Sequence, residues 1–463
     1  MFVMILVLFI FSLFLGIYIY FLFKFKKYIS IIEPCSMIRM DCSQAHKDGS
    51  GLSERTSALL TISIIVCARN EEKNIKNLLE ALVNQDIFAD EDNSDSIEII
   101  IANDQSDDDT EKIAKEYSDK YDFIKIYNVE YRDNALSPKK NALKQAIYIA
   151  KGEIILLTDA DCIPTKNWVR SHRTMYEKYS NTDMIVGFAK TILNKECNEY
   201  LTINEYIPPK FNVLQTAEGN YASGQHKCVP TDGAERKIAS PTDGAERKLA
   251  SPTEPPLTKG GKFEHIDFLI LMFAAQGAIQ SGIPFSCSGQ NLSYKRESFY
   301  DVHGFDDIDH FISGDDLLLM QKFVKYKKNI KFLAIADVFT ETVPINSWND
   351  LFNQRARWAS NLKAMTKMNL IFFIYLLSCF VCMGLLPFVL LPLYLIKIYF
   401  DDKFIKKALV LWNLDGYVLQ KNISFLGFKI NMLQLWYIIN PFYILTVSAL
   451  GIFSFFKWKD RRG

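Results

Sequence analysis

One short stretch decides the fold of this chain, Ile154-Ile155-Leu156-Leu157-Thr158-Asp159-Ala160-Asp161. An apolar run of this length, bounded by polar residues, is typical of a buried central strand. Because side chains alternate along an extended chain, Asp159 and Asp161 lie on one side, at the carboxyl end of the strand. Open α/β sheets bind ligands at that end of their parallel strands. Two carboxylates there offer hard oxygen ligands to Mg²⁺, although such a pair also suits a solvated turn or a helix cap.

The composition indicates a membrane-anchored protein with a soluble centre. The chain has 463 residues and a formal net charge of zero, so the charge gives no argument for binding nucleic acid. Aromatic residues make up 13% and the mean hydropathy is +0.02, both high for a soluble enzyme, and the apolar residues concentrate at the two ends. The nine cysteines lack paired metal-ligand spacing, which predicts a reducing compartment and no zinc or redox site.

The centre of the chain alternates strand and helix patterns. Buried-strand runs at residues 59–66 and 97–102 each end in polar residues, and helical spacing follows each of them. A further helix opens at Pro138, shortly before the strand that ends in the two carboxylates. This alternation predicts an α/β domain over residues 58–345, built on a doubly wound, mostly parallel sheet. Polar residues at the carboxyl ends of neighbouring strands are what a nucleotide site requires.

Apolar segments at both ends predict membrane spans. Residues 1–27 are expected to form an N-terminal transmembrane anchor, because an almost wholly apolar run is followed there by lysines, and residues 28–57 form a polar tether. Residues 346–370 predict a helix in the membrane interface, and residues 371–463 a C-terminal transmembrane region whose number of spans the sequence leaves open. Together these features predict a multi-pass protein of the cell (inner or plasma) membrane, with the central domain in the cytoplasm.

A repeat of eleven residues interrupts the central domain. The unit Pro-Thr-Asp-Gly-Ala-Glu-Arg-Lys-Ile-Ala-Ser begins at Pro230 and recurs from Pro241, with only Ile238 replaced by Leu249. So short a repeat, rich in Pro, Gly and charge, cannot bury a core of its own. Residues 229–260 are therefore interpreted as a disordered surface insertion, whose role stays open.

Two further polar groups follow the repeat. Asp315 and Asp316 precede an apolar helical run, so these carboxylates are candidates for acid–base chemistry or for a helix N-cap, or for both. Gln354, Arg357 and Trp358 are spaced i, i+3 and i+4, which places all three on one face of a helix.

The motifs, in this order, resemble those of the membrane-integrated family 2 glycosyltransferases, which include cellulose, chitin, hyaluronan and poly-N-acetylglucosamine synthases and ceramide glucosyltransferase. The resemblance covers residues 62–358 apart from the repeat, and extends to the flanking spans. Asn103 and Asp315 stand where the family has Asp and Glu, yet no catalytic carboxylate is missing. The matching segments are Ala68-Arg69-Asn70-Glu71, Asn103-Asp104-Gln105-Ser106, Lys139, Thr158-Asp159-Ala160-Asp161, Gly289-Gln290-Asn291, Gly314-Asp315-Asp316 and Gln354-Arg355-Ala356-Arg357-Trp358.

The resemblance implies a GT-A fold, an inverting sugar transfer from a nucleotide-diphosphate sugar, expected to be a UDP-sugar, and Mg²⁺ or Mn²⁺ as cofactor. Asp316 is implied as the general base, positioned by Asp315, and Asp161 as the metal ligand, with Asp159 directed at the metal or the ribose. The other implied donor-binding residues are Ala68, Arg69, Asn70, Glu71, Asp104, Lys139 and Arg357. The implied acceptor-binding residues are Gly289, Gln290, Asn291, Gln354 and Trp358, the last of which also suits a membrane-interface anchor.

Three interpretations of the function stay open. The first is growth of a polysaccharide or envelope glycan, and the second is transfer of a single sugar to a lipid such as polyprenyl phosphate, diacylglycerol or a ceramide-like lipid. The third is a catalytically silent scaffold that binds nucleotide sugars, which the retained carboxylates argue against. The donor sugar, the linkage and any partner subunit do not follow from the sequence.

Overall fold

The structure, a computed structural model, describes ten stretches of the chain. The predicted tether at 28–57 and most of the predicted repeat insertion at 229–260 lie outside them. The described residues all belong to one compact unit, Met1–Leu193 together with Leu257–Gly463. They are 12–21, 23–24, 60–89, 96–130, 137–192, 258–335, 338–385, 431–453, 457–458 and 461–462.

The predicted parallel sheet is present in the first part of the chain. Its strands are β1 (Ile62–Ala68), β2 (Ile97–Asn103), β3 (Ile124–Asn128) and β4 (Ile154–Asp159), in the order β3-β2-β1-β4, and each pairs in parallel with its neighbour. The register pairs Cys67 with Asp159 across β1 and β4. The carboxyl ends of these strands therefore meet at one edge of the sheet, where their polar residues can share one ligand.

Beyond β4 the sheet becomes mixed. Strand β7 (Leu292–Lys295) runs antiparallel to β4 and is followed in the sheet by β6 (Met184–Thr191), which pairs antiparallel with β7. Strands β8 (Ile330–Leu333) and β9 (Phe339–Thr342) pair in parallel with β6, and β5 (Cys162–Pro164) closes the order against β9. Because β7 lies beside β4, the loop that precedes β7 is brought to the carboxylates of the β4 end.

Helices cover both faces of the sheet, as a doubly wound fold requires. The side chains of β1 alternate between two cores, with Ile65 in one and Ile64 and Val66 in the other. Helix α5 (Pro138–Ile149) and helix α8 (Lys259–Gln280) pack into the first core. The second core is covered by α3 (Ile75–Val83), α4 (Thr110–Ser118) and α6 (Trp168–Lys178), with the short η1 (Asp86–Ala89) beside α6.

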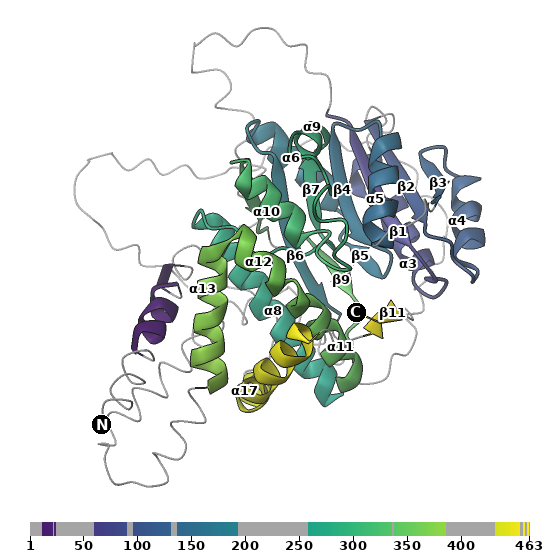
Figure 1. The fold of residues 1–463 in the computed structure, drawn as a ribbon. Helices are drawn as coiled ribbons and strands as arrows, with labels where there is room; N and C mark the ends of the chain where they lie inside the picture. Colours follow the sequence, from purple (N-terminus) through teal and green to yellow (C-terminus); the bar gives the residue numbers. More distant parts are fainter. Residues whose placement is uncertain are drawn as a thin grey trace, which may run out of the picture. The chain divides into compact units, whose positions relative to one another are not determined.

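Most of the remaining helices, namely α10, α11, α12, α13 and α17, gather on one side of the sheet (Figure 1). The predicted interfacial helix at 346–370 is in fact two helices, which are separated at Asn361. Helix α17 packs against α8, α11 and the π-helical turn η4. The elements are α9 (Arg296–Asp301), α10 (Leu317–Lys325), α11 (Trp348–Ser360), α12 (Leu362–Met368), α13 (Leu370–Cys379), η4 (Phe380–Leu385), α17 (Asn431–Ile452), and the small hairpin of β10 (Lys457–Trp458) and β11 (Arg461–Arg462).

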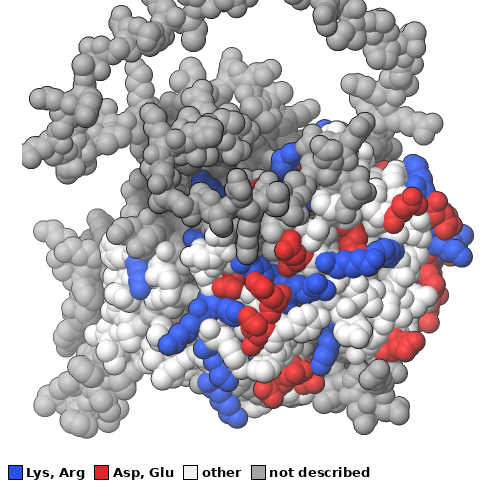
Figure 2. Space-filling view, turned by 90° about the horizontal axis from the view of Figure 1, so that it is seen from above, with Lys and Arg blue, Asp and Glu red and all other residues white. Residues whose placement is uncertain are grey.

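The described part of the chain does not support the predicted transmembrane helices: none of its helices combines the length and the apolar character needed to cross a membrane. Much of the predicted N-terminal anchor, and residues 386–430 of the predicted C-terminal region, lie outside the described residues. On the molecular face of Figure 2, acidic and basic side chains are interspersed, in keeping with the balanced net charge.

Candidate active site

Two loops at the carboxyl ends of β1 and β2 are tied together. The guanidinium of Arg69 donates to the carbonyl oxygen of Asp104 at 3.2 Å and lies 3.9 Å from its carboxylate. The backbone N–H of Asn70 donates to Ser106 Oγ at 3.1 Å, and the Asn70 side chain accepts from the N–H of Asp107 at 2.8 Å. These contacts hold the two predicted nucleotide loops as one rigid edge.

A single cavity of about 1130 Å³ opens beside this edge and collects most of the predicted site residues. Of the predicted donor residues, Glu71, Lys139, Asp159, Asp161 and Arg357 line it. The others lie outside its lining: Ala68, Arg69, Asn70 and Asp104. The side chain of Ala68 is buried in the core, so only its backbone can take part in the site. Its carbonyl oxygen accepts a hydrogen bond from the N–H of Asp104.

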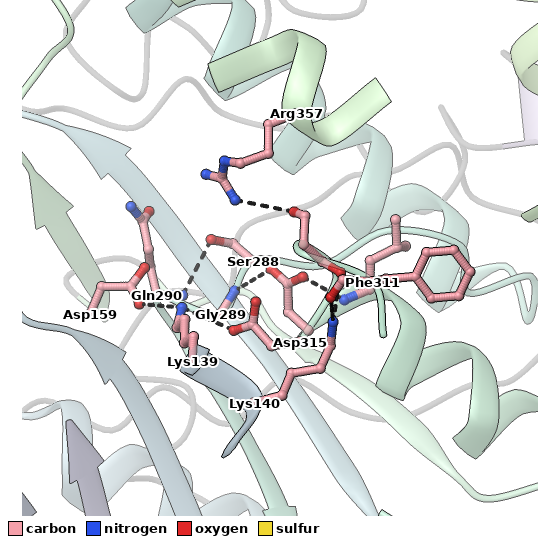
Figure 3. A network of polar contacts seen from close by, with 12 residues as sticks. Lys139, Lys140, Asp159, Ser288, Gly289, Gln290, Phe311, Asp315 and Arg357 are labelled. Carbon is pink, nitrogen blue, oxygen red and sulfur yellow. Dashed lines mark hydrogen bonds and ion pairs between the residues drawn. The ribbon is translucent and has the colours of Figure 1, made fainter. Parts of the chain in front are cut away.

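Lys139, at the start of α5, joins two carboxylates across the cavity floor. Its ammonium group lies 2.8 Å from Asp159 Oδ1 and 2.9 Å from Asp315 Oδ2 (Figure 3). Burial alone would lower the pKa of Lys139, but the two carboxylates outweigh it and hold the pKa well above its usual value. The sequence predicted Lys139 as a donor residue, and the structure adds that it links the β4 end to the loop before α10.

The end of β4 presents a cluster of possible metal ligands. Ligand atoms of Asp159, Asp161 and Cys162 lie within 4.8 Å of one another. Burial, and then the neighbouring Asp159 and Glu71, raise the pKa of Asp161 to about 6. Burial also raises the pKa of the Cys162 thiol well above its usual value, so it stays neutral. The carboxylate oxygens of Asp159 and Asp161 are therefore the ligands that a hard divalent cation would take.

Asp316 combines the two roles that its sequence position allowed. Its Oδ1 accepts from the backbone N–H of Leu317 at 2.6 Å, which caps α10 as expected. Its Oδ2 accepts from the N–H of Gly289 at 2.8 Å, and the carboxylate lines the cavity. Each oxygen retains a second lone pair, so capping leaves the group able to take a proton.

The adjacent carboxylates of Asp315 and Asp316 have opposite pKa shifts. Burial and then the charge of Asp315 raise the pKa of Asp316 above its usual range. Burial also acts to raise the pKa of Asp315, but Lys139 and then Lys140 outweigh it and lower that pKa. One carboxylate is thus held ionised by an ion pair while its neighbour is poised to bind a proton.

Sequence reasoning missed Lys140, which secures the loop that carries the two carboxylates. Its buried ammonium donates to the carbonyl oxygens of Phe311 at 2.5 Å and Ser313 at 2.8 Å. Burial lowers the pKa of Lys140 to about 8. Arg357 donates to Ser313 Oγ at 3.1 Å from the opposite side, so α5 and α11 hold the same loop (Figure 3). Nothing in the local sequence separates Lys140 from Lys139, since only the helix orientation decides which one enters the cavity.

Helix α11 presents Gln354, Arg357 and Trp358 to the cavity, as their spacing predicted. The guanidinium of Arg355 lies 4.2 Å from the centroid of the Trp358 ring, so one face of the ring is already covered. Trp358 therefore offers a restricted surface to any acceptor.

A second buried charge cluster lies between α8, α11 and α17, and the sequence analysis did not single it out. Arg355 Nε donates to Asp267 Oδ2 at 2.8 Å, and the hydroxyl of Tyr443 donates to the same oxygen at 2.9 Å. A second guanidinium nitrogen lies 3.5 Å from Glu264 Oε1. Burial raises the pKa of Glu264 to about 7, because one guanidinium does not neutralise two carboxylates.

Asn291, predicted to bind the acceptor, lies away from the cavity. Its side chain is fully buried and lies outside the cavity lining. The amide oxygen accepts from Trp168 Nε1 and from the ring of His172, both at 2.9 Å, and the amide nitrogen donates to the Phe188 carbonyl at 2.8 Å. Gly187 permits this, since a Cβ there would lie 2.2 Å from the amide. Asn291 thus anchors the loop whose preceding residues, Gly289 and Gln290, do line the cavity.

Comparisons with known proteins identify the family. The profile of Glycosyl transferase family 2 matches residues 63–225, and that of Glycosyl transferase family group 2 matches residues 259–450. The probable glycosyltransferase YdaM of Bacillus subtilis is 37% identical over 113 residues, which is 24% of this chain and 26% of that protein. The dolichyl-phosphate beta-glucosyltransferase of Homo sapiens is 33% identical over 101 residues, 22% of this chain and 31% of that protein.

The matches to individual relatives are partial. The beta-monoglucosyldiacylglycerol synthase of Trichormus variabilis is 34% identical over 108 residues, 23% of this chain and 22% of that protein. The match spans less than a third of the length of each of these relatives. Among solved structures, the mannosyltransferase PcManGT from Pyrobaculum calidifontis, in complex with GDP-Man and Mn²⁺, has a TM-score of 0.45 at 14% identity, covering 95% of this chain and 99% of that one.

The mixed α/β sheet is GT-A-like, and the protein is a glycosyltransferase. The chain belongs to glycosyltransferase family 2.

The structural role of Asn291 predicts a loss of stability on substitution. Asn291→Ala leaves the Trp168 and His172 donors without an acceptor, and we expect it to lower the free energy of unfolding by roughly 3 kcal/mol. Gln290→Ala, one residue away in the cavity lining, should change stability little, because the Gln290 amide oxygen has no hydrogen-bond partner. Urea unfolding of both variants measures this. Equal stability of the two variants would contradict the anchoring role.

The Glu264 cluster predicts a pH-dependent stability. Because the folded-state pKa is raised from 4.5 to about 7, the stability that protonated Glu264 contributes is present below 4.5 and is lost as the pH rises through about 7. Glu264→Gln should therefore gain stability relative to the wild type between about pH 5 and pH 8, by on the order of 3 kcal/mol. Urea unfolding at several pH values measures the difference, with exposed Glu116→Gln as the control. A difference independent of pH would refute the buried titration.

Proposed function

We propose that this protein is an inverting glycosyltransferase that moves a sugar from a nucleotide-diphosphate sugar, expected to be a UDP-sugar, to a hydroxyl group of its acceptor. The observation that carries this proposal is the placement of Asp316, a buried carboxylate with a raised pKa, in the same cavity as Asp159 and Asp161. A base and a diphosphate site on the same cavity are what a single displacement at an anomeric carbon requires.

Asp316 acts as the base in this reaction. The acceptor hydroxyl gives its proton to the Asp316 carboxylate as its oxygen attacks the anomeric carbon, and the nucleoside diphosphate leaves from the opposite side. Two backbone N–H groups, of Gly289 and Leu317, fix the orientation of the carboxylate. Asp315 stays paired with Lys139 and adds negative charge beside the base, which favours proton uptake.

Asp161 and Asp159 are the residues that would hold the expected Mg²⁺ or Mn²⁺. A divalent cation bound there supplies Lewis-acid stabilisation of the departing diphosphate. Arg357 lies in the same cavity and carries a planar guanidinium that suits a phosphate oxygen pair. Lys139 keeps Asp159 in place through its ion pair while leaving Asp161 to the cation.

The acceptor belongs to one of two classes, a growing polysaccharide or envelope glycan, or a lipid to which one sugar is added. Relatives named for transfer to dolichyl phosphate and for the synthesis of a glucosyldiacylglycerol support the second class. A silent scaffold is disfavoured, because the base, the metal ligands and Lys139 are all in place around one cavity. Asp316 takes the proton in the same way from a glycan hydroxyl and from a lipid hydroxyl. The residues that line the rest of the cavity therefore decide which of the two acceptors binds.

We further propose that the protein works at the cell membrane, with its catalytic domain on the cytoplasmic side. Apolar sequence at both ends and the lysines that follow residues 1–23 support this location. Exposed apolar side chains on α13 add to it, since Leu370 is 63% and Ile371 54% exposed, and adjoining exposed apolar residues mark a contact surface.

The base assignment predicts that Asp316→Asn abolishes sugar transfer and leaves donor binding nearly unchanged. We expect a loss of about 10³-fold or more in kcat, measured with a labelled nucleotide sugar, while the exposed Asp309→Asn retains full activity. In the wild type, kcat/KM should fall on the acid side, with a midpoint above the usual aspartate pKa of about 3.9, because the base must be ionised and its pKa is raised. Substantial transfer by Asp316→Asn would overturn the assignment.

The metal assignment predicts that Asp161→Asn removes the metal dependence of nucleotide binding. Wild-type protein should bind UDP more tightly with MnCl₂ or MgCl₂ than with EDTA, since a carboxylate pair recruits the cation that the diphosphate needs. Titration calorimetry with UDP measures this, with the exposed Asp122→Asn as control. If Asp161→Asn keeps the wild-type gain from added metal, Asp161 is not a ligand.

A further inference from the structure

The cavity that contains Asp316 continues into an apolar compartment between helices. Past Gly289 and Trp358, its walls come from α8, α13, η4 and α17. The cavity has a volume of about 1130 Å³, close to the upper end of the roughly 300–1,000 Å³ of small-ligand pockets. The apolar residues that line this compartment include Leu271, Phe285, Phe372, Tyr375, Leu376 and Leu377.

An aromatic wall connects the compartment to the catalytic loop. The ring of Phe285 stacks on Phe372 with centroids 4.5 Å apart and on Tyr375 with centroids 5.0 Å apart. Phe285 precedes Gly289, which donates its N–H to the base Asp316, by only four residues. The loop from Phe285 to Gly289 therefore forms part of the apolar wall at its first residue and hydrogen-bonds the base Asp316 at its last.

Part of the apolar lining of the compartment is exposed. Leu271 of α8 and Leu377 of α13 both line the cavity, yet they are 39% and 36% exposed. On α13 the exposed Leu370 and Ile371 extend this apolar surface. Exposed apolar residues at the edge of an apolar compartment match a hydrocarbon chain, whose headgroup would then reach toward Asp316.

We propose that this apolar compartment holds the hydrocarbon chain of a neutral lipid alcohol, whose hydroxyl is the acceptor at Asp316. The inference rests on the proposed sugar transfer and names its acceptor. The methylene groups of such a chain match the apolar walls, because they need no polar partner when they are buried. A polysaccharide gains little from such walls, because its hydroxyl groups need polar partners when they are buried.

The charges at the base favour an alcohol over a lipid phosphate. Asp315 and Asp316 are adjacent carboxylates that repel an anionic acceptor. The lysines nearby are engaged, since Lys139 pairs with Asp159 and Asp315, and Lys140 donates to two backbone carbonyls. A phosphate also attacks without giving up a proton, and would leave the buried base Asp316 without a role. An alcohol gives its proton to Asp316, its oxygen bonds to the anomeric carbon, and the carbon–diphosphate bond breaks with its electrons leaving on the nucleoside diphosphate.

The test narrows the compartment and compares acceptors, using the full chain in detergent micelles. Leu376→Trp fills the compartment, and Ile374→Trp is the matched control, a tryptophan on the same helix at a position outside the cavity lining. The acceptors are dioleoylglycerol, a polyprenyl phosphate and a water-soluble oligosaccharide, and the donor is a labelled nucleotide sugar that the wild type hydrolyses. Slow hydrolysis of the donor by water is recorded in parallel.

We expect the wild type to glycosylate dioleoylglycerol faster than the other two acceptors. Leu376→Trp should lower that transfer about tenfold or more and leave donor hydrolysis unchanged, while Ile374→Trp leaves both unchanged. The inference is overturned if polyprenyl phosphate or the oligosaccharide is the better acceptor, or if folded Leu376→Trp transfers as the wild type does. If the wild type neither glycosylates any of the acceptors nor hydrolyses the donor, the result would instead count against the proposed function itself.

A chain-length series keeps the inference testable should Leu376→Trp fail to fold. With the wild type alone, diacylglycerols of increasing acyl length should show a falling KM with little change in kcat, because the added methylenes are bound in the compartment and do not touch the reacting atoms. A KM independent of acyl length would overturn the inference. The smaller Leu376→Phe should shift the preference toward shorter chains.

Discussion

The ion pairs of Lys139 are the interaction on which the site depends. Its ammonium lies between Asp159, at the end of a parallel strand, and Asp315, in the loop before α10. Removing one partner from a buried pair leaves an uncompensated charge, so the three groups hold each other in place. This bridge joins the nucleotide half of the domain to the half that carries the base. It also keeps Asp315 ionised, which helps to keep the pKa of Asp316 high.

Buried charge recurs in this part of the molecule with a common geometry. Lys140 of α5 donates to the backbone of Ser313, in the loop that precedes the base Asp316. Arg357 of α11 donates to the side chain of the same residue. Arg355, two residues before Arg357, points instead toward Asp267 and fixes α11 against α8. Buried ion pairs are weak sources of stability, but each allows only a few arrangements of its partners. The helices beside the cavity are thereby held in one register relative to the base.

The parallel half of the fold and the main carboxylates could be predicted, because both depend on local sequence. An apolar run ending in Asp159 and Asp161 is sufficient to place two carboxylates at a sheet edge, and Asp316 before an apolar helix is sufficient for an N-cap. Asn291 could not be placed in this way. Its neighbours Gly289 and Gln290 do line the cavity, but its own side chain turns into the core, where Gly187 leaves room for it.

The sequence by itself determined the order of strands and helices, the carboxylates of the site and the family to which they belong. These follow from residue types at short spacing, where backbone geometry leaves few alternatives. The tertiary structure alone decided that Lys140 holds the loop of the base, and that an apolar compartment adjoins Asp316. Both depend on how elements far apart in the chain pack, and packing distances are not encoded in any single stretch of residues.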